Sequence, residues 1–121
     1  MLRFIRSVCY ALRGISYAVR TQMNMKIHIV AAVLVVAVSL YLKVPPLEQA
    51  LLVITVFMVW AAELFNTALE KLVDLVSPEK QVLAGIVKDV AAGAVLVTAI
   101  NAVLMAYLII WPRLYASGWW G

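Results

Sequence analysis

The sequence predicts an all-α membrane protein with an N-terminal amphipathic surface helix and three transmembrane helices. Hydrophobic residues make up 66% of the 121 residues, and charged residues make up only 13%. Soluble domains carry about 25% charged residues, so the composition argues against a water-soluble fold, as does the mean hydropathy of +1.02. Three long apolar segments separated by short polar ones supply the spans. We therefore expect residues 1–121 to form a single membrane domain.

Residues 1–25 are predicted to form a helix that lies in the membrane surface. Apolar side chains recur on one face and basic side chains on the other, which is typical of such helices. The apolar face carries Ile5, Val8, Leu12, Ile15 and Val19, and the opposite face carries Arg3, Arg6, Arg13, Arg20, Tyr10 and Tyr17. A signal peptide is not expected, because no separate apolar core precedes a small-residue cleavage site.

The membrane helices are predicted over residues 27–44, 47–76 and 83–111. The first is apolar except for His28 and ends near Lys43, before two prolines that favour a turn. The second is longer than the ~20 residues that cross a bilayer, so its last turns are expected to emerge from the hydrocarbon. The third is expected to end at Trp111, because Pro112 has no N–H for the helical hydrogen bond.

The basic residues predict the orientation of the chain in the membrane. Eight flank the side that holds the N-terminus and the loop before the third span: Arg3, Arg6, Arg13, Arg20, Lys26, Lys71, Lys80 and Lys88. Only Lys43 and Arg113 flank the other side. The positive-inside rule therefore puts the N-terminus in the cytoplasm and the C-terminus outside. The tryptophans Trp111, Trp119 and Trp120 are then expected to be anchors at the outer interface.

Polar side chains form a stripe on one face of the second membrane helix. A sector about 100° wide holds all of them: Glu63, Asn66, Thr67, Glu70 and Asp74. The preceding segment, residues 50–62, carries no charge, so Glu63 lies at the edge of the hydrocarbon. A carboxylate there costs several kcal/mol unless it is paired or used. Three helices are not expected to surround so wide a stripe, so we predict that neighbouring subunits cover it.

The stripe fits two classes of function. Phosphoryl transfer needs a divalent cation held by carboxylates, a base near the attacking hydroxyl, and cations for the phosphates. The acidic groups would be Glu63, Glu70, Asp74 and Asp89, and the cations would be Lys88, Arg6 and Arg13. Alternatively, the stripe is a seam between subunits or a proton or cation path in a non-enzymatic protein. A transporter, however, would place ionisable groups near mid-membrane on several helices, whereas these cluster at one end.

Other residues add little to this choice. The glycines form neither a P-loop nor a GxGxxG pattern, so nucleotide binding would need another architecture. Cys9 is the single cysteine, which excludes a disulfide framework. His28 has no second histidine to share a metal with it, and we expect it to pack at the membrane interface.

Three motifs match a known family. They are Glu63-x-x-Asn66-Thr67-Ala68-x-Glu70-x-x-x-Asp74, Lys88-Asp89-Val90-Ala91-Ala92-Gly93, and Asn24-x-Lys26-x-His28. They resemble the signature of the small prokaryotic lipid kinases, the diacylglycerol kinases and the Gram-positive undecaprenol kinases. The resemblance implies an ATP-dependent lipid kinase of the bacterial inner membrane with Mg²⁺ as cofactor. It also implies a homotrimer with sites between subunits and no nucleic-acid partner. The motifs are nearer the undecaprenol branch, so undecaprenol is the first expected substrate and diacylglycerol the second.

The same resemblance implies a role for each site residue. Glu70 matches the catalytic base and metal ligand, and Glu63, Asn66 and Arg3 match residues near the lipid. The residues matching the nucleotide site are Arg6, Tyr10, Arg13, Glu79, Lys88 and Asp89. Two positions depart from the family pattern. Gln22 replaces a metal-binding glutamate and keeps only a neutral oxygen ligand, and Gln81 replaces a frequent histidine.

Overall fold

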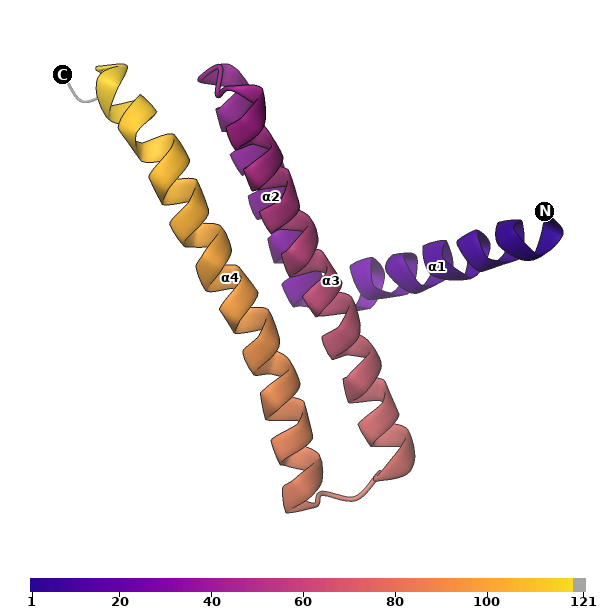
Figure 1. Ribbon diagram of the computed structural model, residues 1–121. Helices are drawn as coiled ribbons and strands as arrows, with labels where there is room; N and C mark the ends of the chain where they lie inside the picture. The colour runs from indigo at the N-terminus through magenta and orange to yellow at the C-terminus, as the bar shows by residue number, and fades with distance from the viewer. Residues whose placement is uncertain (119–121) are drawn as a thin grey trace.

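The computed structural model describes residues 1–118, and these form four helices with short connections (Figure 1). The helices are α1 (Leu2–Thr21), α2 (Met23–Tyr41), α3 (Pro46–Val76) and α4 (Val82–Ala116). Helices α2, α3 and α4 are each long and apolar enough to cross a membrane, which confirms the predicted fold class. The proposed anchors Trp119 and Trp120 lie outside the described residues.

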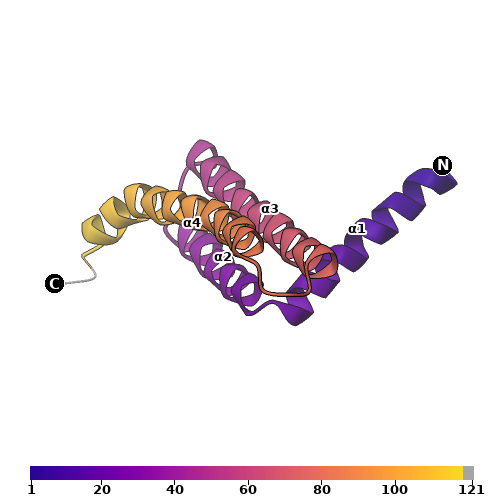
Figure 2. The same ribbon diagram turned by 90° about the horizontal axis from the view of Figure 1, so that it is seen from below.

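Helix α1 leaves the bundle sideways and is not packed along it (Figures 1 and 2). The bend falls at Gln22, whose extended backbone (φ −105°, ψ 115°) both ends α1 and begins α2. The surface helix is therefore shorter than the predicted 1–25. Its C-terminal part contacts α2 and α3, where Ala18 is buried. This arrangement suits a helix that lies across the ends of membrane spans.

The turn between α2 and α3 explains why two long spans can lie side by side. Lys43 has a left-handed backbone (φ 54°), and Val44 N donates to Ser39 O (3.0 Å) while Lys43 N donates to Leu40 O (3.1 Å). These are the bonds of a Schellman motif, which reverses the chain after a helix. Pro46 then opens α3 at a position where its missing N–H costs nothing.

Helix α3 is the centre of the bundle. It packs closely against α4 and on another side against α2, whereas α2 and α4 barely touch. At the end near the α2–α3 turn, Arg113 Nη1 lies 2.6 Å from Glu48 Oε2 and joins α4 to α3. The same end holds an apolar cluster of Val44, Leu52 and Ile109. Most other apolar side chains on the spans are exposed, as expected for helices that face lipid.

The last helix does not end at Trp111, where Pro112 was expected to stop it. Helix α4 continues through Pro112 to Ala116. Pro112 removes only one backbone donor, and the turn beyond it keeps its bonds, with Ser117 N donating to Arg113 O (3.0 Å). Arg113 also folds its own Nη1 back onto Ile109 O (2.7 Å). Proline near a helix end therefore costs too little here to stop the helix.

Candidate functional site

The polar stripe of α3 runs from a buried end to an exposed end. Glu63 is 2% exposed and Asn66 8% exposed, Glu70 is half-buried, and the Asp74 side chain is 56% exposed. The expectation that three helices cannot surround the stripe is therefore wrong for its first turns. Helices α2 and α4 of the same chain close over them from two sides. The stripe thus connects a site inside the bundle with the exposed C-terminal end of α3.

A polar pocket of about 300 Å³ lies at the buried end of the stripe. Each of the three spans contributes to its wall: Asn24, Ile27 and His28 from α2, Glu63 and Asn66 from α3, and Ala92, Val95, Leu96 and Ala99 from α4. The small side chains of α4 leave room between the helices. Two residues predicted to lie near the lipid, Glu63 and Asn66, therefore share one cavity.

Asn66 connects this pocket to Glu70. Its Nδ2 donates a hydrogen bond to Glu70 Oε1 (3.2 Å) across one turn of α3. Its Oδ1 is buried and has no hydrogen-bond donor among residues 1–118. An amide donor on one carboxylate oxygen fixes the direction of the other, which is how a general base is aimed at its proton. The predicted base is therefore oriented by its own helix.

His28 does more than the packing role expected for it. Its Nε2 lies 3.2 Å from Glu63 Oε1, so it meets the most buried carboxylate of the stripe across the α2–α3 interface. Asn24, one turn earlier on α2, lines the same pocket. The spacing of Asn24 and His28 put both on one helix face, and that spacing was the signal in the sequence for this part of the site.

The predicted nucleotide residues on α4 lie near the aqueous end of the stripe. Lys88 Nζ contacts Asp74 Oδ1 at 2.6 Å and links the end of α3 to the start of α4. The Lys88 side chain is 41% exposed and that of Asp74 is 56% exposed, and Asp89 and the loop residue Glu79 are exposed. Exposed pairs contribute only about 0–1 kcal/mol to stability, so a phosphate group can compete with Asp74 for the lysine.

The predicted residues of α1 are not brought to the pocket. All four are exposed: Arg3, Arg6, Tyr10 and Arg13. The N-terminal half of α1 leads away from α3 and α4 (Figure 1), and Arg13 lies over the ring of Tyr10 at 5.8 Å. Gln22 is also absent from the pocket wall, and its Nε2 donates to Thr21 Oγ1 (3.4 Å). One chain therefore brings the α3 and α4 residues of the predicted site together but not the residues on α1 or Gln22.

The donor set at the stripe suits a hard divalent cation. The side chains are carboxylates and an amide, and Asn66 Oδ1 is an unpaired buried oxygen. No three histidine, cysteine or acidic groups among residues 1–118 converge as a metal cluster. Mg²⁺ in phosphoryl-transfer sites is commonly held by one or two carboxylates together with substrate phosphates, so the residues fit such an ion when a nucleotide completes its shell.

Comparison with known proteins gives a consistent result. A family model described as prokaryotic diacylglycerol kinase matches residues 9–110. A diacylglycerol kinase of Synechocystis sp. is 43% identical over 106 residues, which cover 87% of this chain and 61% of that protein. The undecaprenol kinase of Bacillus subtilis is 35% identical over 112 residues, covering 93% of this chain and 91% of that protein. A diacylglycerol kinase of Escherichia coli is 30% identical over 111 residues. The chain thus spans under two thirds of the Synechocystis protein but most of the other two.

Proposed function

This chain belongs to the prokaryotic diacylglycerol kinase family, and we propose that it transfers the γ-phosphoryl group of ATP to undecaprenol or, as a second substrate, to diacylglycerol. Family membership makes it a lipid kinase and a multi-pass protein of the bacterial inner membrane. A non-enzymatic role for the stripe is therefore set aside. The relatives' names support both lipids, and undecaprenol ranks first because the motifs at Asn66–Ala68 and Lys88–Gly93 resemble that branch more closely.

The observation that carries the proposal is the hydrogen bond from Asn66, which lines the polar pocket, to Glu70, which lies one turn nearer the exposed end of the stripe. A lipid kinase must bring a hydroxyl from the membrane to a nucleotide from the cytoplasm. Glu63 and Asn66 lie at the membrane side of the stripe and Lys88 at its aqueous side. Glu70 lies between them, half-buried. The lipid would therefore reach Glu70 from one side and the nucleotide would reach it from the other.

In the proposed reaction, the γ-phosphoryl group passes directly from ATP to the lipid hydroxyl. The Glu70 carboxylate takes the proton of the lipid hydroxyl, the hydroxyl oxygen bonds to the γ-phosphorus, and the bond from that phosphorus to the β–γ bridging oxygen breaks. The products are the lipid monophosphate and ADP. Lys88 leaves Asp74 to bind phosphate oxygens, where a positive charge counters the charge of the transferring group. Most of the catalysis is positioning and charge stabilisation.

The proposed cofactor is Mg²⁺. Glu70 would hold it together with the phosphates of ATP, and Gln22 would contribute a neutral oxygen in place of a carboxylate. When bound, the ion neutralises phosphate charge and holds the phosphates in position. Asn66 would keep Glu70 in place for both tasks through its hydrogen bond. Asp89 and Glu79 are proposed to lie beside the nucleotide.

We also propose that the basic residues of α1 serve the site of a neighbouring subunit in a homotrimer. The N-terminal half of α1, which carries Arg3, Arg6 and Tyr10, leads away from α3 and α4 of its own chain (Figures 1 and 2). In the trimer, these side chains of one subunit would lie near Glu70 of the neighbouring subunit. The N-terminus and the aqueous end of α3 are proposed to face the cytoplasm, because most basic residues lie there.

Transfer of label from ATP to lipid tests this proposal. The purified protein in lipid bilayers is given γ-labelled ATP and Mg²⁺ with undecaprenol or diacylglycerol. We expect label in the lipid fraction, with the higher kcat/KM for undecaprenol. The Glu70→Gln variant, which keeps size and shape, is the matched control and should transfer little. No transfer to either lipid by the parent protein would refute the function, and a preference for diacylglycerol would reverse the substrate order.

A further inference from the structure

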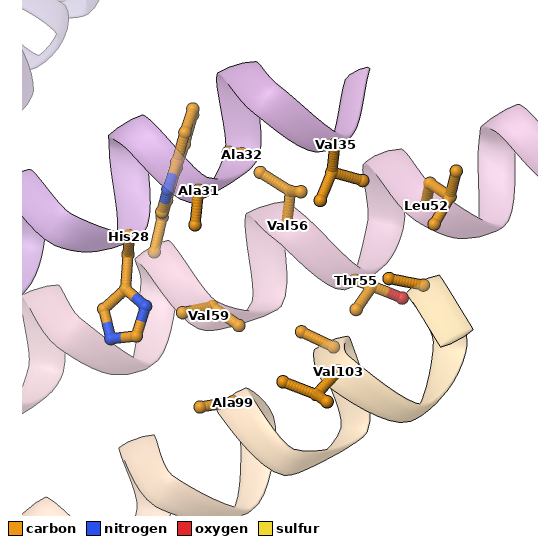
Figure 3. Close-up of a pocket in the computed structure, with 13 residues that line it drawn as sticks. His28, Ala31, Ala32, Val35, Leu52, Thr55, Val56, Val59, Ala99 and Val103 are labelled. Carbon is orange, nitrogen blue, oxygen red and sulfur yellow. The ribbon is translucent and has the colours of Figure 1, made fainter. Parts of the chain in front are cut away.

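His28 stands at the boundary between two hollows of different chemistry. On one side is the polar pocket with Asn24, Glu63 and Asn66. On the other is an apolar groove of about 200 Å³ that runs along α3. Figure 3 shows the imidazole of His28 at one end of this groove and Leu52 and Thr55 at the other. One side chain therefore touches both the hydrocarbon-like and the polar parts of the bundle.

The carboxylate that His28 meets is the most buried acidic group of the chain. Glu63 is 2% exposed, and its Oε1 has no aligned hydrogen-bond donor among residues 1–118. The imidazole nitrogen Nε2 of His28 lies 3.2 Å from it, across the α2–α3 interface. Thr67 is close by, but its hydroxyl donates to the backbone oxygen of Glu63 (2.9 Å) and not to the carboxylate. The direction of this carboxylate thus depends on one contact from a different helix.

The apolar groove next to this contact can hold the hydrocarbon chain of a lipid. Its walls include Ala31 from α2, Val59 from α3 and Ala99 from α4 (Figure 3), together with the larger ring of Trp60. A hydrocarbon chain in this groove would carry its polar end past His28 to Glu63. A free carboxylate oxygen is an acceptor for a hydroxyl. A lipid alcohol therefore matches both hollows at once, whereas ATP matches neither.

We infer that His28 is a positioning residue for the lipid substrate, acting through Glu63. It holds the buried carboxylate at the point where the apolar groove meets the polar pocket, so that Glu63 binds the lipid hydroxyl as the lipid enters, before the hydroxyl moves along the stripe to Glu70. This inference rests on the proposed lipid kinase function. In this inference, His28 acts as an N–H donor that is required for binding the lipid and not for binding the nucleotide.

The test compares single variants of the protein in bilayers. His28→Leu removes the donor, and His28→Gln keeps an N–H at a similar distance from the backbone. Arg113→Leu is the matched control, because it breaks the ion pair between α3 and α4 at the opposite end of the bundle. KM for lipid and for ATP are measured with the labelled-ATP assay. We expect His28→Leu to raise the lipid KM about tenfold and to leave the ATP KM within about twofold.

Rescue and coupling separate positioning from general damage. In His28→Gln, the lipid KM should stay close to that of the parent protein. Glu63→Gln should raise the lipid KM, and adding His28→Leu to it should have little further effect, because contacting residues are non-additive. Arg113→Leu should change neither KM. Each variant is first checked for the parent's oligomer size and thermal unfolding in mild detergent.

The possible outcomes test the role of His28 separately from the proposed lipid kinase activity. If the parent protein phosphorylates lipid but His28→Leu leaves the lipid KM unchanged, the inference fails and the function stands. Equal rises in both KM values, full additivity with Glu63→Gln, or no rescue by His28→Gln would also overturn it. If the parent transfers no label to any lipid, both are refuted together.

Discussion

Asn66 and Glu70 are joined by a hydrogen bond across one turn of α3, with Asn66 Nδ2 3.2 Å from Glu70 Oε1. Asn66 is buried and Glu70 is half-buried, so the bond crosses the point where the polar stripe leaves the interior. A residue anchored inside the bundle thereby fixes a carboxylate that reaches toward water. In the proposed reaction, this is the link between the lipid end of the site and the chemical step.

Replacing Glu70 by Gln should abolish most activity without unfolding the protein. The change removes a base and a charged oxygen ligand together, and loss of a general base alone costs about 10²- to 10⁴-fold in rate. We expect kcat to fall at least about 100-fold while the oligomer keeps its size in detergent. Turnover is measured as labelled lipid formed per minute. Near-normal turnover would remove Glu70 from the catalytic role.

Asn66→Ala should weaken catalysis less than the loss of Glu70 itself. The base stays, but its orienting hydrogen bond is lost, and misplacement by about 1 Å can cost up to about 100-fold in rate. We expect a fall in kcat of about 10- to 100-fold, without a matching rise in ATP KM. A control is Ser39→Ala, which removes a hydroxyl that bonds Gln49 far from the site. Equal effects of the two variants would indicate damage to packing and not to orientation.

Much of this site could be predicted from the sequence, because the period of a helix is local information. The spacing of Glu63, Asn66, Glu70 and Asp74 was enough to place them on one face of α3. Their burial was not predictable in the same way. It depends on how α2 and α4 pack around α3, which the period of one helix does not show. The contact between His28 and Glu63 was missed for the same reason, since it joins two helices.

The ends of the helices show the opposite limit. The sequence indicated a turn before Pro45, and a turn is found, but Lys43 occupies a left-handed position that usually favours glycine. Such a backbone costs roughly 1–2 kcal/mol, and the Schellman hydrogen bonds around Lys43 offset it. At Pro112 the expected stop does not occur. In both cases the hydrogen bonds of neighbouring residues outweigh the intrinsic backbone preference of the residue.

Lys88→Ala should raise the KM for ATP much more than the KM for lipid. Lys88 is proposed to leave Asp74 for a phosphate group, so its loss should remove nucleotide affinity and little stability, because an exposed pair contributes about 0–1 kcal/mol. The control is Asp74→Ala, which breaks the same ion pair but keeps the lysine. It should leave the ATP KM unchanged or lower it. Equal effects of Lys88→Ala on both substrates would mean that the pair only joins the helix ends.

Mixing two inactive variants should recover activity if sites are shared between subunits. Arg6→Ala is expected to lack a nucleotide contact, and Glu70→Gln lacks the base. In a mixed trimer some sites would take α1 from one variant and α3 from the other, and so would be complete. We expect measurable turnover after co-expression, and a trimer by mass in mild detergent. An active monomer, or no recovery in mixed oligomers of confirmed composition, would contradict shared sites.

Gln22→Glu should lower the Mg²⁺ concentration needed for half-maximal activity. Gln22 forms the bend between α1 and α2, and its amide donates to Thr21 Oγ1 (3.4 Å). A carboxylate there would add a negative oxygen, which Mg²⁺ prefers because it gives up its water reluctantly. The lipid KM should change less. The control is Gln22→Ala, which removes the oxygen altogether and should raise the Mg²⁺ requirement. If both variants leave the Mg²⁺ titration unchanged, Gln22 shapes the bend alone, and if only the glutamate variant is active, the parent site has lost its metal ligand.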